Sequence, residues 1–173
     1  MYLRVAGVVP ESIVDGPGIR YTVFVQGCCH RCPGCHNPQT HPLDGGEKVA
    51  VEDLLKDIKG RKLLRGVTFS GGEPFLQPGP LAYLGRQVRQ MGLTVITYTG
   101  FLFEDILGKS RKERDFRELL LVSHWLIDGP FVIQRRDWKL SYRGSSNQRI
   151  IDVPASLKER RTCILEPEKR LTG

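Results

Sequence analysis

The chain has 173 residues, which at about 150 residues per domain predicts a single domain over 1–173. Its 40% hydrophobic and 26% charged residues are typical of a soluble globular protein, and its net charge is +7. No apolar run approaches the ~20 residues needed to cross a bilayer, and the N-terminus does not combine a basic segment with an apolar one. Membrane insertion and secretion are therefore disfavoured, and we expect a cytoplasmic protein.

The predicted elements alternate between strands and helices along the chain. A short β-branched and aromatic run predicts a strand over 21–25, and apolar residues at helical spacing predict a helix over 51–59 that ends at Gly60. Further strands are predicted over 66–69, 93–98 and 125–127, with helices over 81–91, 103–107 and 116–120. This alternation predicts an α/β fold with a mostly parallel sheet and right-handed crossovers.

Unusual polar segments follow each of the four predicted strands. They are residues 28–36, 70–74, 99–100 and 128–130. The carboxyl ends of parallel strands meet at one edge of a sheet, where ligands and catalytic groups gather. The sequence therefore predicts one site built from four successive loops.

Four of the five cysteines fall within residues 28–35, too close together for long-range disulfides. The spacing C-x3-C-x2-C groups three of them, Cys28, Cys32 and Cys35. Thiolates on one tight loop suit either zinc or an iron–sulfur cluster. A closed zinc site would take its fourth ligand from a nearby histidine, whereas a cubane held by three cysteines leaves one iron open for catalysis. The candidate histidines are His30, His36 and His41.

The remaining two cysteines are expected to be bystanders. Cys29 adjoins Cys28 and would point elsewhere, and Cys163 is isolated near the C-terminus, so both are expected to pack as small apolar residues. His124 lies in an apolar run and is expected to be a core residue rather than a ligand.

The cysteine loop and the Gly71-Gly72-Glu73 motif one strand later together resemble the signature of the radical S-adenosylmethionine superfamily. The segment 14–20 is similar to the start of the glycyl-radical-enzyme activases, and the segments 126–131 and 143–149 resemble the branch that acts on anaerobic ribonucleotide reductases. The resemblance implies a partial, open (βα) barrel of the radical S-adenosylmethionine type. Its core would cover about 5–153, followed by a short C-terminal extension.

The resemblance also implies two cofactors. In this family a 4Fe-4S cluster is held by three cysteines, here Cys28, Cys32 and Cys35, and its open iron binds S-adenosylmethionine. The reduced cluster cleaves S-adenosylmethionine to methionine and a deoxyadenosyl radical. The implied cofactor contacts are Gly34, Cys35 and His36 on the adenine side, Gly71, Gly72 and Glu73 at the methionine end, and Thr99 and Asp128 at a further cofactor or cation position.

The implied activity is that of an enzyme that generates a glycyl radical on an anaerobic ribonucleoside-triphosphate reductase. Its partners would be this protein substrate and a low-potential one-electron donor, with neither nucleic acid nor a membrane. No general base is assigned, because hydrogen-atom abstraction depends on proximity and orientation.

Two alternatives remain open. One is an activase of another glycyl radical enzyme, such as a formate-lyase type, although those activases are generally longer. The other is a zinc-stabilised nucleic-acid-binding module, which the cysteine loop and the basic charge would suit. Against the second stands the low aromatic content of 8%, which is not interleaved with the basic residues.

The positive charge lies mainly in the later part of the chain. Residues 1–108 hold 11 basic and 10 acidic side chains, whereas residues 109–173 hold 15 and 9. We expect this excess to mark a docking face for an acidic partner surface, with an attraction that salt weakens. The segment 143–149 could bind the cofactor, bind the partner or form a polar loop.

Overall fold

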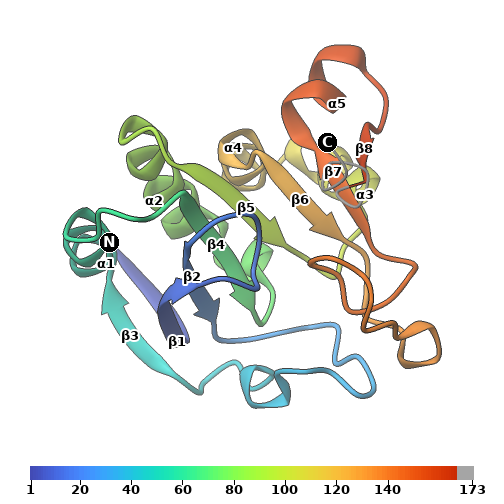
Figure 1. The fold of residues 1–173 in the computed structure, drawn as a ribbon, viewed down its shortest axis with the longest axis horizontal. Coiled ribbons are helices and arrows are strands. Elements are labelled where there is room, and N and C mark those ends of the chain that lie inside the picture. The colour runs from blue at the N-terminus through green and yellow to red at the C-terminus, as the bar shows by residue number, and fades with distance from the viewer. Residues whose placement is uncertain (167–173) are drawn as a thin grey trace.

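The computed structural model describes residues 1–166 and forms one open sheet of eight strands with helices packed against it (Figure 1). The strands are β1 (Tyr2–Ser12), β2 (Arg20–Val25), β3 (Glu47–Ala50), β4 (Gly66–Gly71), β5 (Thr94–Tyr98), β6 (Trp125–Asp128), β7 (Arg149–Asp152) and β8 (Ile164–Leu165). The helices are α1 (Val51–Lys59), α2 (Pro78–Gln90), α3 (Phe103–Ser110), α4 (Arg114–Val122) and α5 (Val153–Glu159). Short 3-10 turns cover η1 (Pro38–Thr40), η2 (Pro74–Leu76) and η3 (Ile133–Arg135). The predicted α/β class with an open sheet is confirmed.

The four central strands are parallel, and the strands on both flanks are antiparallel. The sheet order is β3-β1-β2-β4-β5-β6-β7-β8, with parallel pairing from β2 through β6. β1 pairs antiparallel with β2 and β3, and β7 pairs antiparallel with β6 and β8. The expectation of a parallel sheet is therefore confirmed for its centre, while the antiparallel flanks were not predicted.

Helices cover one face of the central strands. In α1 the four residues at helical spacing, Val51, Leu54, Leu55 and Ile58, are all buried as predicted. They join α2 and α4 in a core with alternate strand residues such as Val23, Phe69 and Leu126, each 0% exposed. Burial of one such side chain contributes about 1.5–3 kcal/mol, so this layer stabilises the strands whose ends carry the polar loops.

The opposite face of the central strands is concave and partly polar. Because side chains alternate along a strand, Phe24, Ser70 and Tyr98 point away from the helix layer and line a cavity. Register places Phe24 level with Ser70 on the neighbouring strand. The alternation of side chains along each strand thus determines which of them form the floor of the cavity.

The segment 14–20 crosses this concave face. The Thr22 hydroxyl donates to the Asp15 carboxylate at 3.0 Å, and the Thr68 hydroxyl donates to the Asp15 carbonyl at 2.8 Å. Arg20 is fully buried and donates from Nε to Thr68 Oγ1 at 2.7 Å, and burial lowers the pKa of Arg20 to about 10. The segment therefore closes the amino-terminal end of the concave face.

Helix α5 and strand β8 form the part of the predicted C-terminal extension that is described. β8 pairs with β7 at the edge of the sheet, and residues 167–173 lie outside the described residues. Across residues 1–166, every helix is too short or too polar to cross a membrane.

Helices α2 and α4 approach each other closely at Gly85, which yields a paired prediction. A Cβ on Gly85 would lie 2.7 Å from Cγ2 of Val122, a β-branched side chain with little freedom to move, whereas a Cβ on Gly108 in α3 meets open space. Gly85→Ala is expected to destabilise the fold by about 1–3 kcal/mol. Gly108→Ala is expected to stabilise it by up to about 1 kcal/mol. The midpoint of urea unfolding should fall in Gly85→Ala and rise in Gly108→Ala. A higher midpoint in Gly85→Ala would contradict this helix packing.

Candidate functional site

The loops that follow the parallel strands line one cavity of about 850 Å³. The lining residues come from the cysteine loop after β2, from 70–72 at the end of β4, from 98–100 at the end of β5 and from Gly129 after β6. Figure 1 shows this edge where the arrows of β4, β5 and β6 end, with the segment 129–148 beside it in orange. The four segments that were predicted to form one site therefore line one cavity.

Three cysteine thiols reach this cavity. Cys28, Cys32 and Cys35 all line it, and none forms a disulfide. Burial raises the pKa of the Cys28 thiol, so a metal that binds it displaces a proton. Within residues 1–166 no three His, Cys, Asp or Glu side chains are gathered closely enough to hold a single metal ion. Thiols spread along one cavity wall supply the soft donors that an iron–sulfur cluster takes from a protein.

The cysteine loop, residues 26–37, is tied back to the segment that follows it. The Gly27 amide donates to the Thr40 carbonyl at 2.8 Å, and the Cys28 amide donates to the His41 carbonyl at 3.2 Å. The two other cysteines lie elsewhere. Cys29 is exposed, so the expectation that it packs as a small apolar residue is wrong. The Cys163 thiol contacts the Arg161 carbonyl at 3.6 Å, and neither thiol lines the cavity.

Gly71 and Gly72 allow β4 to approach the start of the cysteine loop. Gly71 has a φ of +95°, and a Cβ there would lie 2.7 Å from the amide nitrogen of Val25. A Cβ on Gly72 would lie 2.1 Å from the Gly27 carbonyl oxygen. The Gly72 amide donates to the Val25 carbonyl and the Glu73 amide to the Gly27 carbonyl, each at 2.8 Å. Both glycines line the cavity, and their lack of side chains is required by this backbone contact.

The carboxylate of Glu73 is fully buried and gathers donors from three loops. Its Oε1 accepts from the Phe75 amide and the Thr99 hydroxyl, both at 2.9 Å. Its Oε2 accepts from the Gly100 amide at 2.9 Å and lies 2.7 Å from His30 Nε2. Glu73 is absent from the described lining of the cavity. This predicted cofactor residue lies behind the wall, where it joins the cysteine loop to the ends of β4 and β5.

Thr99 and Asp128 belong to different networks. Thr99 lines the cavity, and its hydroxyl donates to Glu73 and accepts from the Phe101 amide at 3.1 Å. Asp128 is fully buried outside the described cavity lining, and its carboxylate accepts from the Phe103 amide at the start of α3 at 2.8 Å. The structure thus brings Thr99 to the cavity and places Asp128 beneath the wall.

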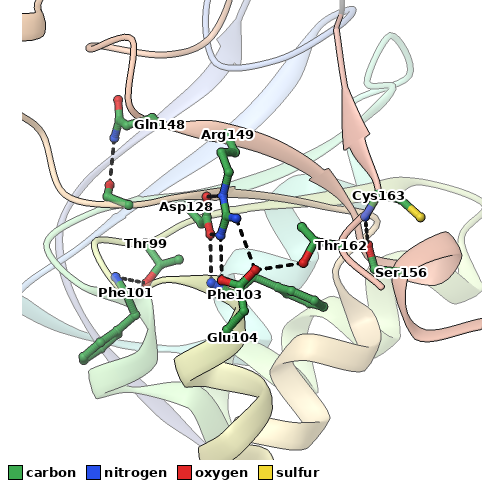
Figure 2. Close-up of polar contacts among 11 residues, drawn as sticks. Thr99, Phe101, Phe103, Glu104, Asp128, Gln148, Arg149, Ser156, Thr162 and Cys163 are labelled. Carbon is green, nitrogen blue, oxygen red and sulfur yellow. Dashed lines mark hydrogen bonds and ion pairs between the residues drawn. The ribbon is translucent and has the colours of Figure 1, made fainter. Parts of the chain in front are cut away.

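Arg149 clamps Asp128 to helix α3. Its Nε donates to Asp128 at 3.0 Å, and its Nη2 donates to Glu104 at 2.7 Å (Figure 2). The hydrogen bonds from Arg149 lower the pKa of Glu104 to about 2. In the sheet, Asp128 and Arg149 are register partners on β6 and β7, so the clamp closes the base of the segment between them.

The segment 129–148 forms the outer wall of the cavity. At its base, Gln148 donates from Nε2 to the Gly129 carbonyl at 3.0 Å (Figure 2), and its Oε1 accepts from the Gly144 amide at 2.8 Å. Gln148, Gly144 and Arg143 line the cavity. Three residues of the motif over 143–149 therefore contribute to the wall of the cavity.

Two of the three residues expected on the adenine side line the cavity. They are Cys35 and His36, whereas Gly34 is outside the described lining and packs on Ile133. The ring of His36 lies 4.9 Å from that of Phe131 and 5.9 Å from that of Trp138, centroid to centroid. An aromatic group therefore bridges the cysteine loop and the outer wall.

Sequence reasoning missed several side chains of the cavity, among them Tyr98 and His30. Tyr98 lines it and donates to the Tyr142 carbonyl at 2.7 Å, and the period of two along β5 could have identified it. His30 also lines it, although the sequence suggested this histidine only as a zinc ligand. Its place between two of the predicted ligand cysteines was the available signal.

Comparison with known proteins identifies the family of the chain. Residues 14–151 match the model of a family described as a 4Fe-4S single cluster domain. The chain is 32% identical over 148 residues to the anaerobic ribonucleoside-triphosphate reductase-activating protein of Escherichia coli K12, covering 80% of this chain and 92% of that protein. It is 42% identical over 118 residues to the pyruvate formate-lyase-activating enzyme of Clostridium pasteurianum, covering 60% of this chain and 48% of that protein. The crystal structure of QueE from Escherichia coli matches with a TM-score of 0.45 and 21% identity, over 58% of this chain and 53% of that chain.

The family match over residues 14–151 defines a class of proteins with a single 4Fe-4S cluster. Within this class, the chain belongs to the family of anaerobic ribonucleoside-triphosphate reductase-activating proteins, which are radical S-adenosylmethionine enzymes. The family implies an iron–sulfur cluster and S-adenosylmethionine as cofactors, and it favours an activase over a zinc-stabilised module.

The close approach at Gly72 predicts a specific loss of stability. In Gly72→Ala the new Cβ would meet a backbone carbonyl, which cannot move aside by a change of rotamer. We expect a loss of about 1–3 kcal/mol in the free energy of unfolding. Gly7→Ala in β1 is the matched control, because nothing lies within 4 Å of its Cβ position. Urea unfolding measures both variants, and equal losses would contradict the tight contact between β4 and the cysteine loop.

Proposed function

We propose that this chain activates an anaerobic ribonucleoside-triphosphate reductase by generating a glycyl radical on it. The observation that carries the proposal is the cavity at the carboxyl ends of the parallel strands, lined by the three thiols of the C-x3-C-x2-C loop and by Gly71 and Gly72. The match covers 92% of the Escherichia coli reductase-activating protein, so the resemblance extends to nearly the whole of that protein.

The proposed cluster ligands are the thiolates of Cys28, Cys32 and Cys35, which leave one iron of a 4Fe-4S cluster for S-adenosylmethionine. The backbone of Gly71 and Gly72, which lines the cavity, is the proposed contact for the methionine end. When bound, the two cofactors supply the reductive cleavage of S-adenosylmethionine and the removal of a hydrogen atom from a glycine Cα.

The remaining predicted site residues have supporting roles in this proposal. Gly34 and His36, with Cys35, shape the side assigned to adenine, and Thr99 completes the wall beside it. Glu73 and Asp128 act from behind, because their carboxylates accept hydrogen bonds from the protein itself. The chain thereby holds the reactants at a fixed distance, which is the main requirement of hydrogen-atom abstraction.

The reductase is proposed to dock against the outer wall of the cavity. Arg135, Arg136 and Lys139 are exposed there beside Trp138, whose side chain is 77% exposed. These residues carry part of the basic excess found beyond residue 108. A low-potential one-electron donor is the second proposed partner, because each reductive cleavage consumes one electron.

A formate-lyase type of glycyl radical enzyme is the second candidate substrate. The 42% identity to the pyruvate formate-lyase-activating enzyme favours it, but the match covers only 48% of that enzyme. Coverage of 92% favours the reductase.

Radical formation on purified partner enzymes tests the function directly. The anaerobically reconstituted chain, with S-adenosylmethionine and a reductant, is expected to produce a glycyl radical signal in electron paramagnetic resonance when the reductase is added. Cys28→Ala should abolish the signal and lower the iron content, because one proposed ligand is lost. Cys163→Ala, which changes a thiol outside the cavity lining, is the control and should retain both. A signal only with a formate-lyase type enzyme would refute the reductase assignment.

Docking through the basic wall predicts a salt-dependent activation rate. Lys139→Glu is expected to slow radical formation on the reductase and to reduce its dependence on ionic strength, since exposed charges steer association and are screened by salt. Lys59→Glu makes the same change at the end of α1 and is expected to have little effect. The test is the activation rate of each chain measured from low to high salt concentration. If the rate of the original chain does not change with salt concentration, this docking surface is contradicted.

A further inference from the structure

His30 reaches from the cysteine loop to a buried acceptor. It lies in sequence between the proposed ligands Cys28 and Cys32, and its side chain is 17% exposed. Its Nε2 is 2.7 Å from Oε2 of Glu73, whose side chain is 0% exposed. An ionised carboxylate can only accept hydrogen bonds, so Nε2 carries the proton and donates it.

The end of β5 is shaped around the imidazole ring. The ring of His30 meets that of Phe101 edge to face, with centroids 4.6 Å apart. Gly100 makes room for it, because a Cβ there would lie 2.4 Å from Cδ2 of His30. The side chain therefore occupies a defined place between the cysteine loop and the loop that follows β5.

The acceptor is fixed independently of His30. Glu73 also accepts from the Phe75 amide, the Thr99 hydroxyl and the Gly100 amide. These donors belong to the loops at the ends of β4 and β5, which pair in parallel in the centre of the sheet. A hydrogen bond to an ionised acceptor is stronger than one between neutral groups, so the contact can hold a loop in place.

We propose that His30 is a positioning residue that fixes the cysteine loop to the Glu73 carboxylate. The contact holds Cys28 and Cys32 at a set position relative to the backbone of Gly71 and Gly72. The same backbone is joined to the base of the cysteine loop by the hydrogen bonds that the Gly72 and Glu73 amides donate. The inference rests on the proposed function, because it concerns the loop assigned to the cluster. Binding of S-adenosylmethionine then depends on a residue that is neither a cluster ligand nor part of the glycine motif.

Two substitutions at this position separate the hydrogen bond from the mere presence of a polar group. In His30→Gln the amide nitrogen can take the place of Nε2 and donate to Glu73. In His30→Asn the amide ends nearer the backbone, so its donor does not reach. Arg86→Gln is an additional control, because it breaks a surface ion pair with Glu118 between α2 and α4.

The measurements use the full chain carrying its cluster, under anaerobic conditions and without the reductase. They are the dissociation constant for S-adenosylmethionine, the change that this ligand causes in the electron paramagnetic resonance spectrum of the reduced cluster, and the rate of trypsin cleavage after the exposed Arg31. His30→Asn is expected to raise the dissociation constant by about tenfold to hundredfold, to blunt the spectral change and to speed cleavage of the loop. His30→Gln should recover most of the original behaviour, and Arg86→Gln all of it.

Equal behaviour of the Asn and Gln variants, whether both match the original chain or both lose ligand binding alike, overturns the proposal. Failure of the proposed function gives a different result. In that case no chain forms a glycyl radical on the reductase, while the difference between the two His30 variants in ligand binding and loop cleavage remains. The cleavage rate after Arg31 is also measured on the chain before the cluster is installed, so the comparison does not depend on the cluster.

Discussion

The cavity depends on one buried carboxylate. Removing an ionised group from water costs several kcal/mol unless the protein supplies partners, and Glu73 receives them from the cysteine loop, from its own loop after β4 and from the loop after β5. The three loops must therefore adopt their positions together, because displacement of one leaves a buried acceptor without a donor. The walls of the cavity are coupled in this way even though the loops are distant in sequence.

The parallel centre of the sheet makes this coupling achievable. Val25 and Gly71 are register partners, so the cysteine loop and the glycine motif leave the sheet at the same level. The absence of side chains at Gly71 and Gly72 then lets the two backbones touch, with the Gly72 and Glu73 amides donating across the gap. Strand register therefore brings the start of the cysteine loop against the backbone of the two glycines.

Patterns within single segments of the sequence identified the parts of the fold that depend on local periodicity. The helix over 51–59 was predicted because its apolar residues repeat at helical spacing over one buried face, and the strand over 21–25 because it is a short β-branched and aromatic run. The flanks escaped prediction for physical reasons. β1 is interrupted by two irregularities of register, while β7 and β8 have only four and two residues. Such strands are defined by their neighbours and carry little pattern of their own.

The sequence predicted which loops and thiols line the cavity, but not where the carboxylates of Glu73 and Asp128 lie. Cysteine spacing and strand ends identified the loops, and all three predicted thiols line the cavity. Glu73 and Asp128, expected at the cofactor, instead lie behind the wall. A motif shows that a carboxylate follows a strand, but the direction of its side chain depends on donors such as His30 and Arg149, which are 43 and 21 residues away.

The two carboxylates, Glu73 and Asp128, have similar hydrogen-bond arrangements behind the wall of the cavity. Each lies at or just after the end of a parallel strand, and each accepts from an amide at the start of a helical element, Phe75 in η2 for Glu73 and Phe103 in α3 for Asp128. Each also accepts from a side chain of a distant segment, which belongs to the cysteine loop in one case and to β7 in the other. Because hydrogen-atom abstraction depends on geometry more than on proton transfer, acids that rigidify the walls serve it better than acids exposed in the cavity. Glu73 and Asp128 therefore act as structural acceptors behind the wall of the cavity.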